Sequence, residues 1–391
     1  MDTRCPNCNA SGMDVFYEVK DIPGHSCLML DDRRAALEYP KRDLSLGFCR
    51  VCGFISNVIF DARVLEYSAR YEEQQSFSPR FRAFQTELIA RLIEQYDMRD
   101  KDVVEIGCGK GDFLLELCEM GRNRGVGIDP ACEPERMQGR GDGRVHFIRD
   151  FYSDRCSELP CDFLCCRHTL EHIHSTNEFV GLTRKVVGDR RDMIVFFEVP
   201  AVERVLGEAA FWDIYYEHCS YFSLGSLARV FRANRFEISE LATDFDDQYL
   251  LIVARPVDKP TAPLLPEEDD LEQITHDVAD FSVKVMDLIS TWRSRVIAFR
   301  EGGKRIAVWG SGSKCVAFLS TVGVASEIET VVDINPYRQV KWLPGSGKQV
   351  AAPESLRVTP VDVILVMNPI YCEEIRRDLD AMGVSAKLVP V

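Results

Sequence analysis

A group of residues able to move a proton stands in the stretch WDIYYEHCSYFS, at 212–223: Tyr215, Glu217 and His218. A histidine titrates near neutral pH and can accept or donate a proton, while a neighbouring carboxylate can fix its tautomer or raise its pKa. If the backbone there is helical, Tyr215 shares a face with His218, three residues later. These groups are suited to removing a proton from carbon and stabilising an enolate, whereas Tyr216 has no predicted role. The aromatic neighbours are expected to serve packing: Trp212, Tyr221 and Phe222.

A second group of residues forms a ligand-binding turn in VVEIGCGKGDFLLELCEMGRNRGVGIDP, at 103–130. An apolar strand ends at Glu105 and runs into three glycines and then into apolar residues at helical spacing, and a second strand closes with Asp129. Glycines at such a turn let a ligand approach the backbone, and an acid that ends the next strand can accept both hydroxyls of a ribose. The three glycines are Gly107, Gly109 and Gly111.

Three details favour S-adenosylmethionine over a dinucleotide as the ligand of this turn. An acidic residue precedes the glycines, which suits an ammonium and a sulfonium better than a pyrophosphate. The glycine pattern is E-x-G-x-G-x-G and not the G-x-G-x-x-G of dinucleotide folds. A third strand, VHFIRDF, ends in Asp150 and Phe151, an acceptor and an apolar face suited to an adenine. The alternative is a glycine-rich turn in an unrelated α/β domain.

These motifs resemble class I S-adenosylmethionine-dependent methyltransferases, with matches over about residues 100–200. The resemblance assigns the three glycines to the methionine end of the cofactor, Asp129 to the ribose and Asp150 to the adenine. His168, at the carboxyl end of the fourth strand CDFLCCRHTLEHI, is expected in the cofactor site because ligands bind at that edge of open α/β sheets. The spacing also allows a metal ion as an alternative, with these ligands: His168, Glu171 and His172.

Two C-x-x-C pairs near the amino terminus, CPNC and CRVCG, have forty residues between them. Each pair points two thiolates at one centre, and two pairs complete the tetrahedral sulfur shell that zinc prefers. A closed shell leaves no place for water, so the zinc would be structural. The alternative is two unrelated pairs of buried thiols. The predicted ligands are Cys5, Cys8, Cys49 and Cys52.

The carboxyl-terminal part carries a second glycine turn. A linker rich in proline and acid follows Pro256, and apolar residues at spacings of three and four over 274–296 predict a long amphipathic helix. The segment RIAVWGSGSKC then leads a strand into Gly310, Gly312 and Lys314, where backbone amides, Ser313 and the lysine suit phosphate. The alternative is a merely tight turn in a degenerate fold.

The elements that carry these residues alternate between strands and helices, which predicts an α/β protein with parallel sheets. At 391 residues the chain is long enough for two or three domains, and we expect boundaries at 1–62, 63–256 and 257–391. A net charge of −15 repels a phosphate backbone and argues against a nucleic-acid partner. No run reaches the length of a membrane span, so we expect a cytoplasmic protein without a membrane partner.

The order of parts resembles the sugar C-methyltransferases: a four-cysteine module, a class I methyltransferase domain with Y-x-E-H after the fifth strand, and a terminal α/β domain with VWGSGSKC, VDINP, LPGSGK and NPIY. Members of that family act on nucleotide-diphosphate 4-keto deoxysugars. The resemblance makes His218 the base that removes the proton beside the ketone, with Glu217 and Tyr215 as supporting polar groups. Tyr71 matches a tyrosine that lines the family's site, although the family's second tyrosine two places on is Glu73 here, which points to a different substrate subgroup.

The resemblance also assigns nucleotide-diphosphate binding to the terminal domain, with Lys314 and Asn368 as contacts beside Gly310 and Gly312. Two other functions stay open from the residues alone. One is an O- or N-methyltransferase of a sugar or another small metabolite, in which His218 deprotonates a hydroxyl. The other is a non-catalytic scaffold with a vestigial cofactor pocket. We expect a monomer or a homodimer.

Overall fold

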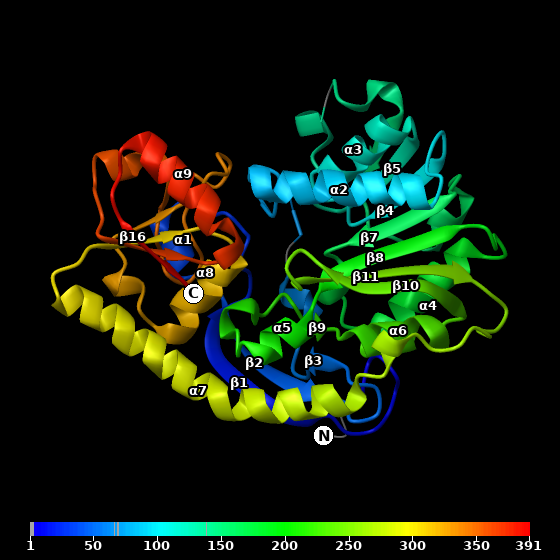
Figure 1. The fold of residues 1–391 in the computed structure, drawn as a ribbon, viewed down its shortest axis with the longest axis horizontal. Helices are drawn as coiled ribbons and strands as arrows, with labels where there is room; N and C mark the ends of the chain where they lie inside the picture. Colours follow the sequence, from blue (N-terminus) through cyan, green and yellow to red (C-terminus); the bar gives the residue numbers. More distant parts are fainter. Residues whose placement is uncertain (1–3, 66, 69, 138) are drawn as a thin grey trace.

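Three β-sheets organise the computed structural model, which describes residues 4–65, 67–68, 70–137 and 139–391 (Figure 1). The central sheet has seven strands in the order β10-β11-β8-β7-β4-β5-β6. Six of them run in the same direction, and β11 runs antiparallel between β8 and β10. The strands are β4 (Asp102–Ile106), β5 (Arg124–Ile128), β6 (Val145–Ile148), β7 (Phe163–Arg167), β8 (Ile194–Pro200), β10 (Phe236–Asp244) and β11 (Tyr249–Pro256).

Helices cover the central sheet, as the apolar character of its strands requires. All five residues of β7 are buried, which is typical of a parallel strand packed on both faces. The chain order reverses between the neighbouring strands β4 and β7, so their carboxyl ends open the crevice in which ligands bind in such sheets. The helices of this part are α2 (Pro79–Gln95), α3 (Asp112–Gly121), α4 (Thr176–Val187), α5 (Val202–Gly207) and α6 (Leu224–Ala233).

A smaller sheet near the amino terminus has the order β1-β2-β3-β9, and all its pairs are antiparallel. Its last strand comes from the proton-transfer stretch, because Tyr221 pairs with Ile55 and Ser220 with Ser56. The amino-terminal segment is therefore tied to the segment that carries His218. The elements are β1 (Asp14–Pro23), α1 (Arg33–Leu37), β2 (Lys41–Phe48), β3 (Ile55–Asn57) and β9 (Ser220–Tyr221).

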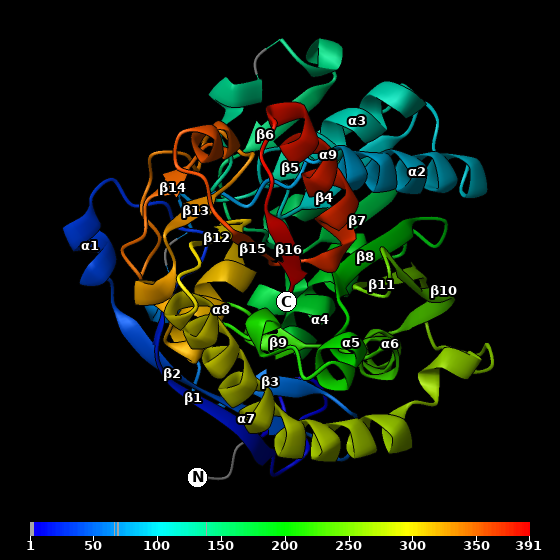
Figure 2. The same cartoon turned by 60° about the vertical axis from the view of Figure 1, so that its left-hand side comes forward.

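The predicted amphipathic helix is α7 (Leu271–Glu301), which runs along the amino-terminal strands to the terminal sheet (Figures 1 and 2). Its apolar face buries Phe281 completely, between the rings of Phe16 and Tyr17 on β1, with centroids 5.8 and 5.4 Å away. The amino-terminal sheet thus shares a core with α7 and with the segment around 202–221. No described helix is both long and apolar enough to cross a membrane.

The terminal sheet has the order β14-β13-β12-β15-β16 with every pair parallel, as the alternation of strands and helices predicts. The order reverses between β12 and β15, which creates a second ligand-type crevice. The elements are β12 (Ile306–Trp309), α8 (Ser313–Val322), β13 (Thr330–Val332), β14 (Val350–Ala351), β15 (Val363–Val366), α9 (Cys372–Met382) and β16 (Lys387–Pro390).

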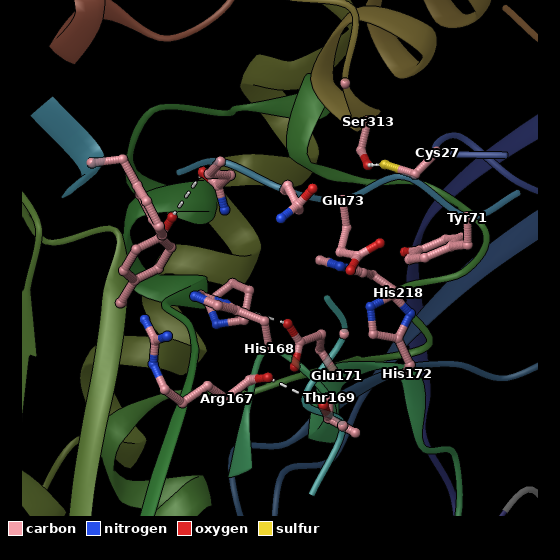
Figure 3. A pocket seen from close by; sticks show the side chains of 18 of the residues that line it. Cys27, Tyr71, Glu73, Arg167, His168, Thr169, Glu171, His172, His218 and Ser313 are labelled. Atoms are coloured by element: carbon pink, nitrogen blue, oxygen red, sulfur yellow. Dashed lines mark hydrogen bonds and ion pairs between the residues drawn. The ribbon is translucent and has the colours of Figure 1, made fainter. Parts of the chain in front are cut away.

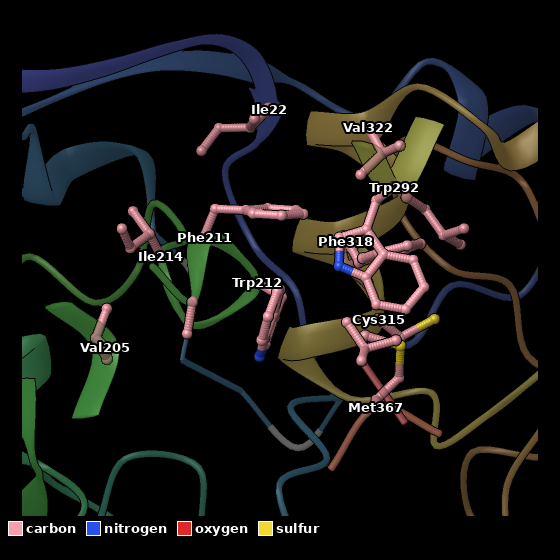
Figure 4. Packing of buried hydrophobic residues seen from close by; sticks show 14 of the residues in the cluster. Ile22, Val205, Phe211, Trp212, Ile214, Trp292, Cys315, Phe318, Val322 and Met367 are labelled. Atoms are coloured by element: carbon pink, nitrogen blue, oxygen red, sulfur yellow. The ribbon is translucent and has the colours of Figure 1, made fainter. Parts of the chain in front are cut away.

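The aromatic residues around the proton-transfer stretch pack as predicted. Trp212, Tyr221 and Phe222 are each at most 5% exposed. Phe211 stacks on Phe318 of α8 with ring centroids 6.0 Å apart, so this segment joins the central part to the terminal sheet (Figure 4). Tyr216 is also buried, and its hydroxyl accepts a hydrogen bond from the backbone N–H of Asp61 at 2.9 Å, which gives this residue a structural role.

Candidate functional site

One cavity of about 640 Å³ opens between the carboxyl ends of the central and terminal sheets. Both glycine turns line it, as do Tyr71, Tyr215 and His218. Side chains from the amino-terminal segment and from both α/β sheets point into the same space (Figure 3). The two switch points of the two sheets therefore face a single site.

The glycines of the first turn let neighbouring side chains pack directly on the backbone beside the cavity. A Cβ on Gly107 would lie 2.8 Å from Cβ of Thr169, and a Cβ on Gly109 would collide with the carboxylate of Glu73. Both glycines also have positive φ angles, of 68° and 52°, which side chains rarely adopt. Glu105 is 2% exposed, and its Oε2 has no hydrogen-bond partner among the described residues. A buried carboxylate with an unpartnered oxygen at a turn that lines the cavity fits a cationic ligand such as S-adenosylmethionine.

Asp129 ends β5 beside this turn. Its Oδ2 accepts from the Gly109 N–H at 2.9 Å and its Oδ1 from the Ala131 N–H at 2.6 Å. Each carboxylate oxygen keeps a second lone pair, so both can still accept from the two hydroxyls of a ribose. Burial raises the pKa of Asp129 and, to about 8, that of Glu105. A bound cation would favour the ionised forms of both.

Three of the predicted cofactor residues lie less centrally. Gly111 is not among the residues lining the cavity, and a Cβ there would lie 2.5 Å from Sδ of Met137 and 2.6 Å from the ring of Phe147. Asp150 is exposed, does not line the cavity, and accepts from the backbone N–H of Phe151 at 2.8 Å. Phe151 lines the cavity with 67% of its surface exposed.

His168 follows β7 and lines the cavity beside two carboxylates. Its Nε2 lies 2.7 Å from Oε1 of Glu198 and its Nδ1 lies 3.6 Å from Oε1 of Glu171. Burial lowers the pKa of His168, but the charge of Glu198 and the contacts with both carboxylates outweigh this effect and raise it to about 9. His168 is therefore a cation at neutral pH and is not available as a base.

The proton-transfer stretch is a turn rather than a helix where Tyr215 and His218 meet. The His218 N–H donates to the carbonyl of Tyr215 at 3.2 Å, which brings the two side chains together. The Tyr215 hydroxyl lies 3.0 Å from Nε2 of His218, and the ring centroids are 4.1 Å apart. Tyr215 and His218 therefore do lie side by side, but a turn brings them together and not the spacing of a helix.

Glu217 points away from the cavity and toward the amino-terminal segment. Its Oε2 lies 2.7 Å from Nδ1 of His25, and its Oε1 accepts from the N–H of Ser26 at 3.1 Å and from the Ser26 hydroxyl. Burial raises the pKa of Glu217, but the hydrogen bonds and charge of its partners outweigh burial and lower it. Glu217 therefore anchors the turn that presents His218, and its own bonds go to His25 and Ser26.

His218 lies in a cluster with Glu171 and His172. The ring centroids of the two histidines are 4.7 Å apart, and one ligand atom from each of the three residues lies within 4.8 Å of the others. The hydroxyl of Tyr67 lies 3.2 Å from Nδ1 of His172. Burial and the charges of His172, His168 and Lys314 hold the pKa of His218 well below its usual value. His218 is therefore neutral at pH 7 and able to accept a proton.

Tyr71 lines the same part of the cavity. Its ring lies edge-on to His172 at 6.4 Å and to His25 at 5.9 Å. Burial raises the pKa values of Tyr71 and Tyr215 well above the ordinary range. Both phenols keep their protons at neutral pH and can donate to an oxyanion.

The second glycine turn repeats the geometry of the first. The N–H and hydroxyl of Ser311 donate to Oδ2 of Asp333 at 2.7 and 2.6 Å, as Gly109 donates to Asp129. The predicted cation Lys314 lines the cavity but forms an ion pair with Asp213. Lys314 is therefore not a free charge.

Asn368 follows β15 and also lines the cavity. Its Nδ2 donates to Oε1 of Gln248 at 2.7 Å, and its Oδ1 accepts from the N–H of Ile370 at 3.3 Å. The bond to Gln248 connects the terminal part to the turn between β10 and β11 of the central sheet.

Arg338 is a buried cation at the second turn that the sequence did not indicate. It is 5% exposed and lines the cavity, and its Nη1 lies 3.7 Å from a Cβ placed on Gly312. Its Nη2 donates to the carbonyl of Glu72, while Nη1 has no hydrogen-bond partner among the described residues. The only signal in the sequence is an arginine a few residues after a strand-ending aspartate, which is too common to assign a role.

The four predicted zinc ligands come together. Sγ of Cys5 lies 3.6 Å from Sγ of Cys52, and Sγ of Cys8 lies 3.6 Å from Sγ of Cys49. All four sulfurs lie within 4.8 Å of one another. Bonds of about 2.3 Å to a tetrahedral zinc place sulfurs about 3.8 Å apart, so the cluster fits that metal.

Two family matches agree with this geometry. The family described as methyltransferase domain matches residues 78–241, and the family described as C-methyltransferase C-terminal domain matches residues 253–389. The strand order, the glycine turn and the first match define a class I S-adenosylmethionine-dependent methyltransferase. With the second match, the chain combines this methyltransferase domain with a C-methyltransferase C-terminal domain.

Three individual proteins that resemble this chain share less than 30% of their residues with it. The C-methyltransferase NovU of Streptomyces niveus is 28% identical over 309 residues, which cover 74% of this chain and 71% of NovU. The Burkholderia thailandensis 1,6-didemethyltoxoflavin-N1-methyltransferase, solved with S-adenosylhomocysteine, is 19% identical, with 44% of this chain and 79% of that chain covered and a TM-score of 0.35. The PH0226 protein of Pyrococcus horikoshii OT3 is 14% identical, with 49% and 100% covered and a TM-score of 0.38.

Proposed function

We propose that this C-methyltransferase methylates the carbon next to the carbonyl of a nucleotide-linked keto-deoxysugar, with His218 as the general base. The observation that carries the proposal is a neutral histidine held by Tyr215 inside a cavity that both glycine turns line. One turn suits the cofactor and the other suits an anionic group of the acceptor. His218 lines the same cavity as the two glycine turns, together with the phenols of Tyr215 and Tyr71.

The proton transfer uses groups of this chain. The C–H bond next to the carbonyl breaks, its proton goes to the His218 imidazole, and its electron pair moves onto the carbonyl oxygen as an enolate. Tyr215 and Tyr71 are protonated and are the donors for that oxygen. When bound, S-adenosylmethionine supplies an electrophilic methyl group for the carbon. Burial and neighbouring cations disfavour a charged His218, so its protonation is favourable only beside the negative enolate.

The anionic group of the acceptor is proposed to bind at the second turn. A phosphate there would meet the amino-terminal end of α8 and the unpartnered Nη1 of Arg338. Lys314 contributes less in this proposal because Asp213 already pairs with its ammonium. A diphosphate between sugar and nucleoside is the group that suits this position.

Hydrogen exchange at carbon tests the proposed base without methyl transfer. Wild-type enzyme incubated in deuterium oxide with nucleotide-linked keto sugars is expected to incorporate deuterium next to the ketone, and with S-adenosylmethionine to add one methyl group there by mass spectrometry. His218→Asn is expected to lose both activities while S-adenosylhomocysteine affinity is nearly kept. His276→Asn, on a side chain that is 68% exposed, is the matched control. Methylation of an oxygen or nitrogen, or full exchange by His218→Asn, would refute the proposal.

We also propose that the four cysteines hold a structural zinc ion. Their sulfur spacing matches a closed shell, and Gly53, with a φ of 74°, turns the backbone under the second pair. The cluster is tied to the central part because Nη1 of Arg229 donates to the carbonyl of Cys52 at 2.9 Å. Metal analysis is expected to find one zinc per chain, and Cys49→Ser is expected to lose it and to unfold at a lower temperature. Zinc content unchanged in that variant would refute this assignment.

A further inference from the structure

Glu73 is a buried carboxylate at the cofactor turn that the proposed reaction does not use. It belongs to the segment 72–78, which passes over the turn that follows β4. Its Oε1 touches the place that a Cβ on Gly109 would occupy, and its Cδ lies 3.5 Å from that place. Its carboxylate points into the cavity near Tyr71 and His218 (Figure 3).

The cations near Glu73 bind other groups. Its Oε2 is buried and has no hydrogen-bond partner among the described residues. Lys110 is close, but its Nζ donates to the carbonyl of Ala131 at 2.9 Å and pairs with Glu133 at 3.2 Å. Arg136 pairs with the neighbouring Glu72 at 2.8 Å. A buried carboxylate oxygen with no donor costs free energy that a ligand with N–H groups would recover.

We propose that Glu73 binds the α-ammonium group of the methionine part of S-adenosylmethionine. Of the two cationic groups of the cofactor, the ammonium has three N–H donors and the sulfonium has none, so the ammonium is the cation that can donate a charged hydrogen bond to Oε2 of Glu73. The other acids at this turn have neighbours of their own: Asp129 accepts from the N–H groups of Gly109 and Ala131, and the charge of Arg167 acts on Glu105. Glu73 contacts the cofactor in this proposal, and the contact does not depend on which acceptor the enzyme uses.

The acid-base properties of the turn support this assignment. Burial raises the pKa of Glu73 to about 8, with Glu72 and Asp129 raising it and Lys110 lowering it. An ammonium beside the carboxylate would lower that pKa, so binding near pH 7.5 should release a proton from Glu73. Glu105, whose pKa is also about 8, is a second source of protons in the same range.

Calorimetry with two ligands tests the contact. S-Adenosylhomocysteine keeps the ammonium and lacks the sulfonium, and 5′-methylthioadenosine lacks the whole amino acid. Glu73→Gln is expected to raise the Kd of S-adenosylhomocysteine by about 10- to 100-fold, as for loss of a charged hydrogen bond. The Kd of 5′-methylthioadenosine is expected to stay within about 3-fold. Glu135→Gln, whose side chain is 75% exposed, is the matched control and is expected to change neither value.

Several outcomes would overturn the proposal. An unchanged Kd for S-adenosylhomocysteine in Glu73→Gln would do so, and so would equal weakening of both ligands, because a structural role affects the adenosine end as well. If Glu73→Gln does not fold, wild-type enzyme supplies the test: calorimetry in two buffers of different ionisation enthalpy is expected to show more protons released with S-adenosylhomocysteine than with 5′-methylthioadenosine. Equal proton release with the two ligands would refute the ammonium contact.

Discussion

Replacing Tyr215 by phenylalanine separates two roles that its hydroxyl could play. The variant keeps the ring that packs 4.1 Å from the His218 ring and removes the oxygen 3.0 Å from Nε2. The raised pKa of Tyr215 keeps the phenol neutral, so a bond to neutral His218 alone is a neutral hydrogen bond. Its loss costs about 0.5–1.5 kcal/mol, or about 2- to 13-fold in rate. A bond to a developing enolate is charged, and its loss costs about 1.5–3 kcal/mol, or about 13- to 160-fold.

We expect Tyr215→Phe to fall in the second range, because the phenol and the imidazole line the same cavity wall. The assay measures the single-turnover rate of methyl transfer and, separately, deuterium exchange next to the ketone without cofactor. Both rates should fall by the same factor, since the enolate forms in both reactions. Tyr216→Phe is the matched control because the Tyr216 hydroxyl bonds to Asp61 instead. A loss of less than about 13-fold for Tyr215→Phe would refute the contact with the enolate, because a neutral bond to His218 accounts for a loss of that size.

Three further predictions follow from burial and charge. Burial and nearby cations hold the pKa of His218 below its usual value. At saturating substrates, kcat should therefore stay constant from pH 8 down to about pH 6.5 and fall only at lower pH, where the base becomes protonated. A pH profile with half-maximal kcat at pH 6.5 or above would contradict this. Arg338→Gln should raise the KM of a nucleotide-linked sugar more than Lys314→Gln does, because Asp213 already pairs with Lys314. If steady-state kinetics show the larger increase in KM for Lys314→Gln, the anionic group binds at Lys314 and not at Arg338. Phe281→Ala should lower the free energy of unfolding, measured by urea titration, by about 3–5 kcal/mol. Val283 is 76% exposed on the same helix, so Val283→Ala should change this free energy by less than about 0.5 kcal/mol. Similar losses for both variants would contradict the packing described for α7.

Local patterns made much of the architecture predictable. The strand-to-helix glycine turns, the two cysteine pairs and the apolar stripe of α7 all depend on residues within a few turns of one another. Such spacing is read directly from the chain, since strands and helices have fixed periods. The α/β fold, the class I strand pattern and the long helix were predicted for this reason, and the structure confirms them. The helical backbone that would place Tyr215 beside His218 is not formed: residues 215–218 make a turn, which brings the two side chains together instead.

Long-range pairs were not predictable in the same way. The sequence places Glu217 next to His218, yet its carboxylate bonds to His25, a partner 192 residues away. Lys314 carries a charge that suits phosphate, but its ion pair with Asp213 joins residues 101 positions apart. Neither partner stands in a motif, so only the packing of the segments shows which side chains meet.

The sequence by itself determined which chemical groups this protein carries and which turns present the backbone to ligands, because these depend on residue type and short-range spacing. The protonation states of these groups, and their hydrogen-bond and ion-pair partners, depend on the tertiary structure. It buries Glu73 and Arg338 with atoms that have no hydrogen-bond partner among the described residues, and it keeps His218 neutral beside Tyr215. The physical reason is that desolvation and Coulomb interactions depend on distance in space, which the order of residues along the chain does not contain.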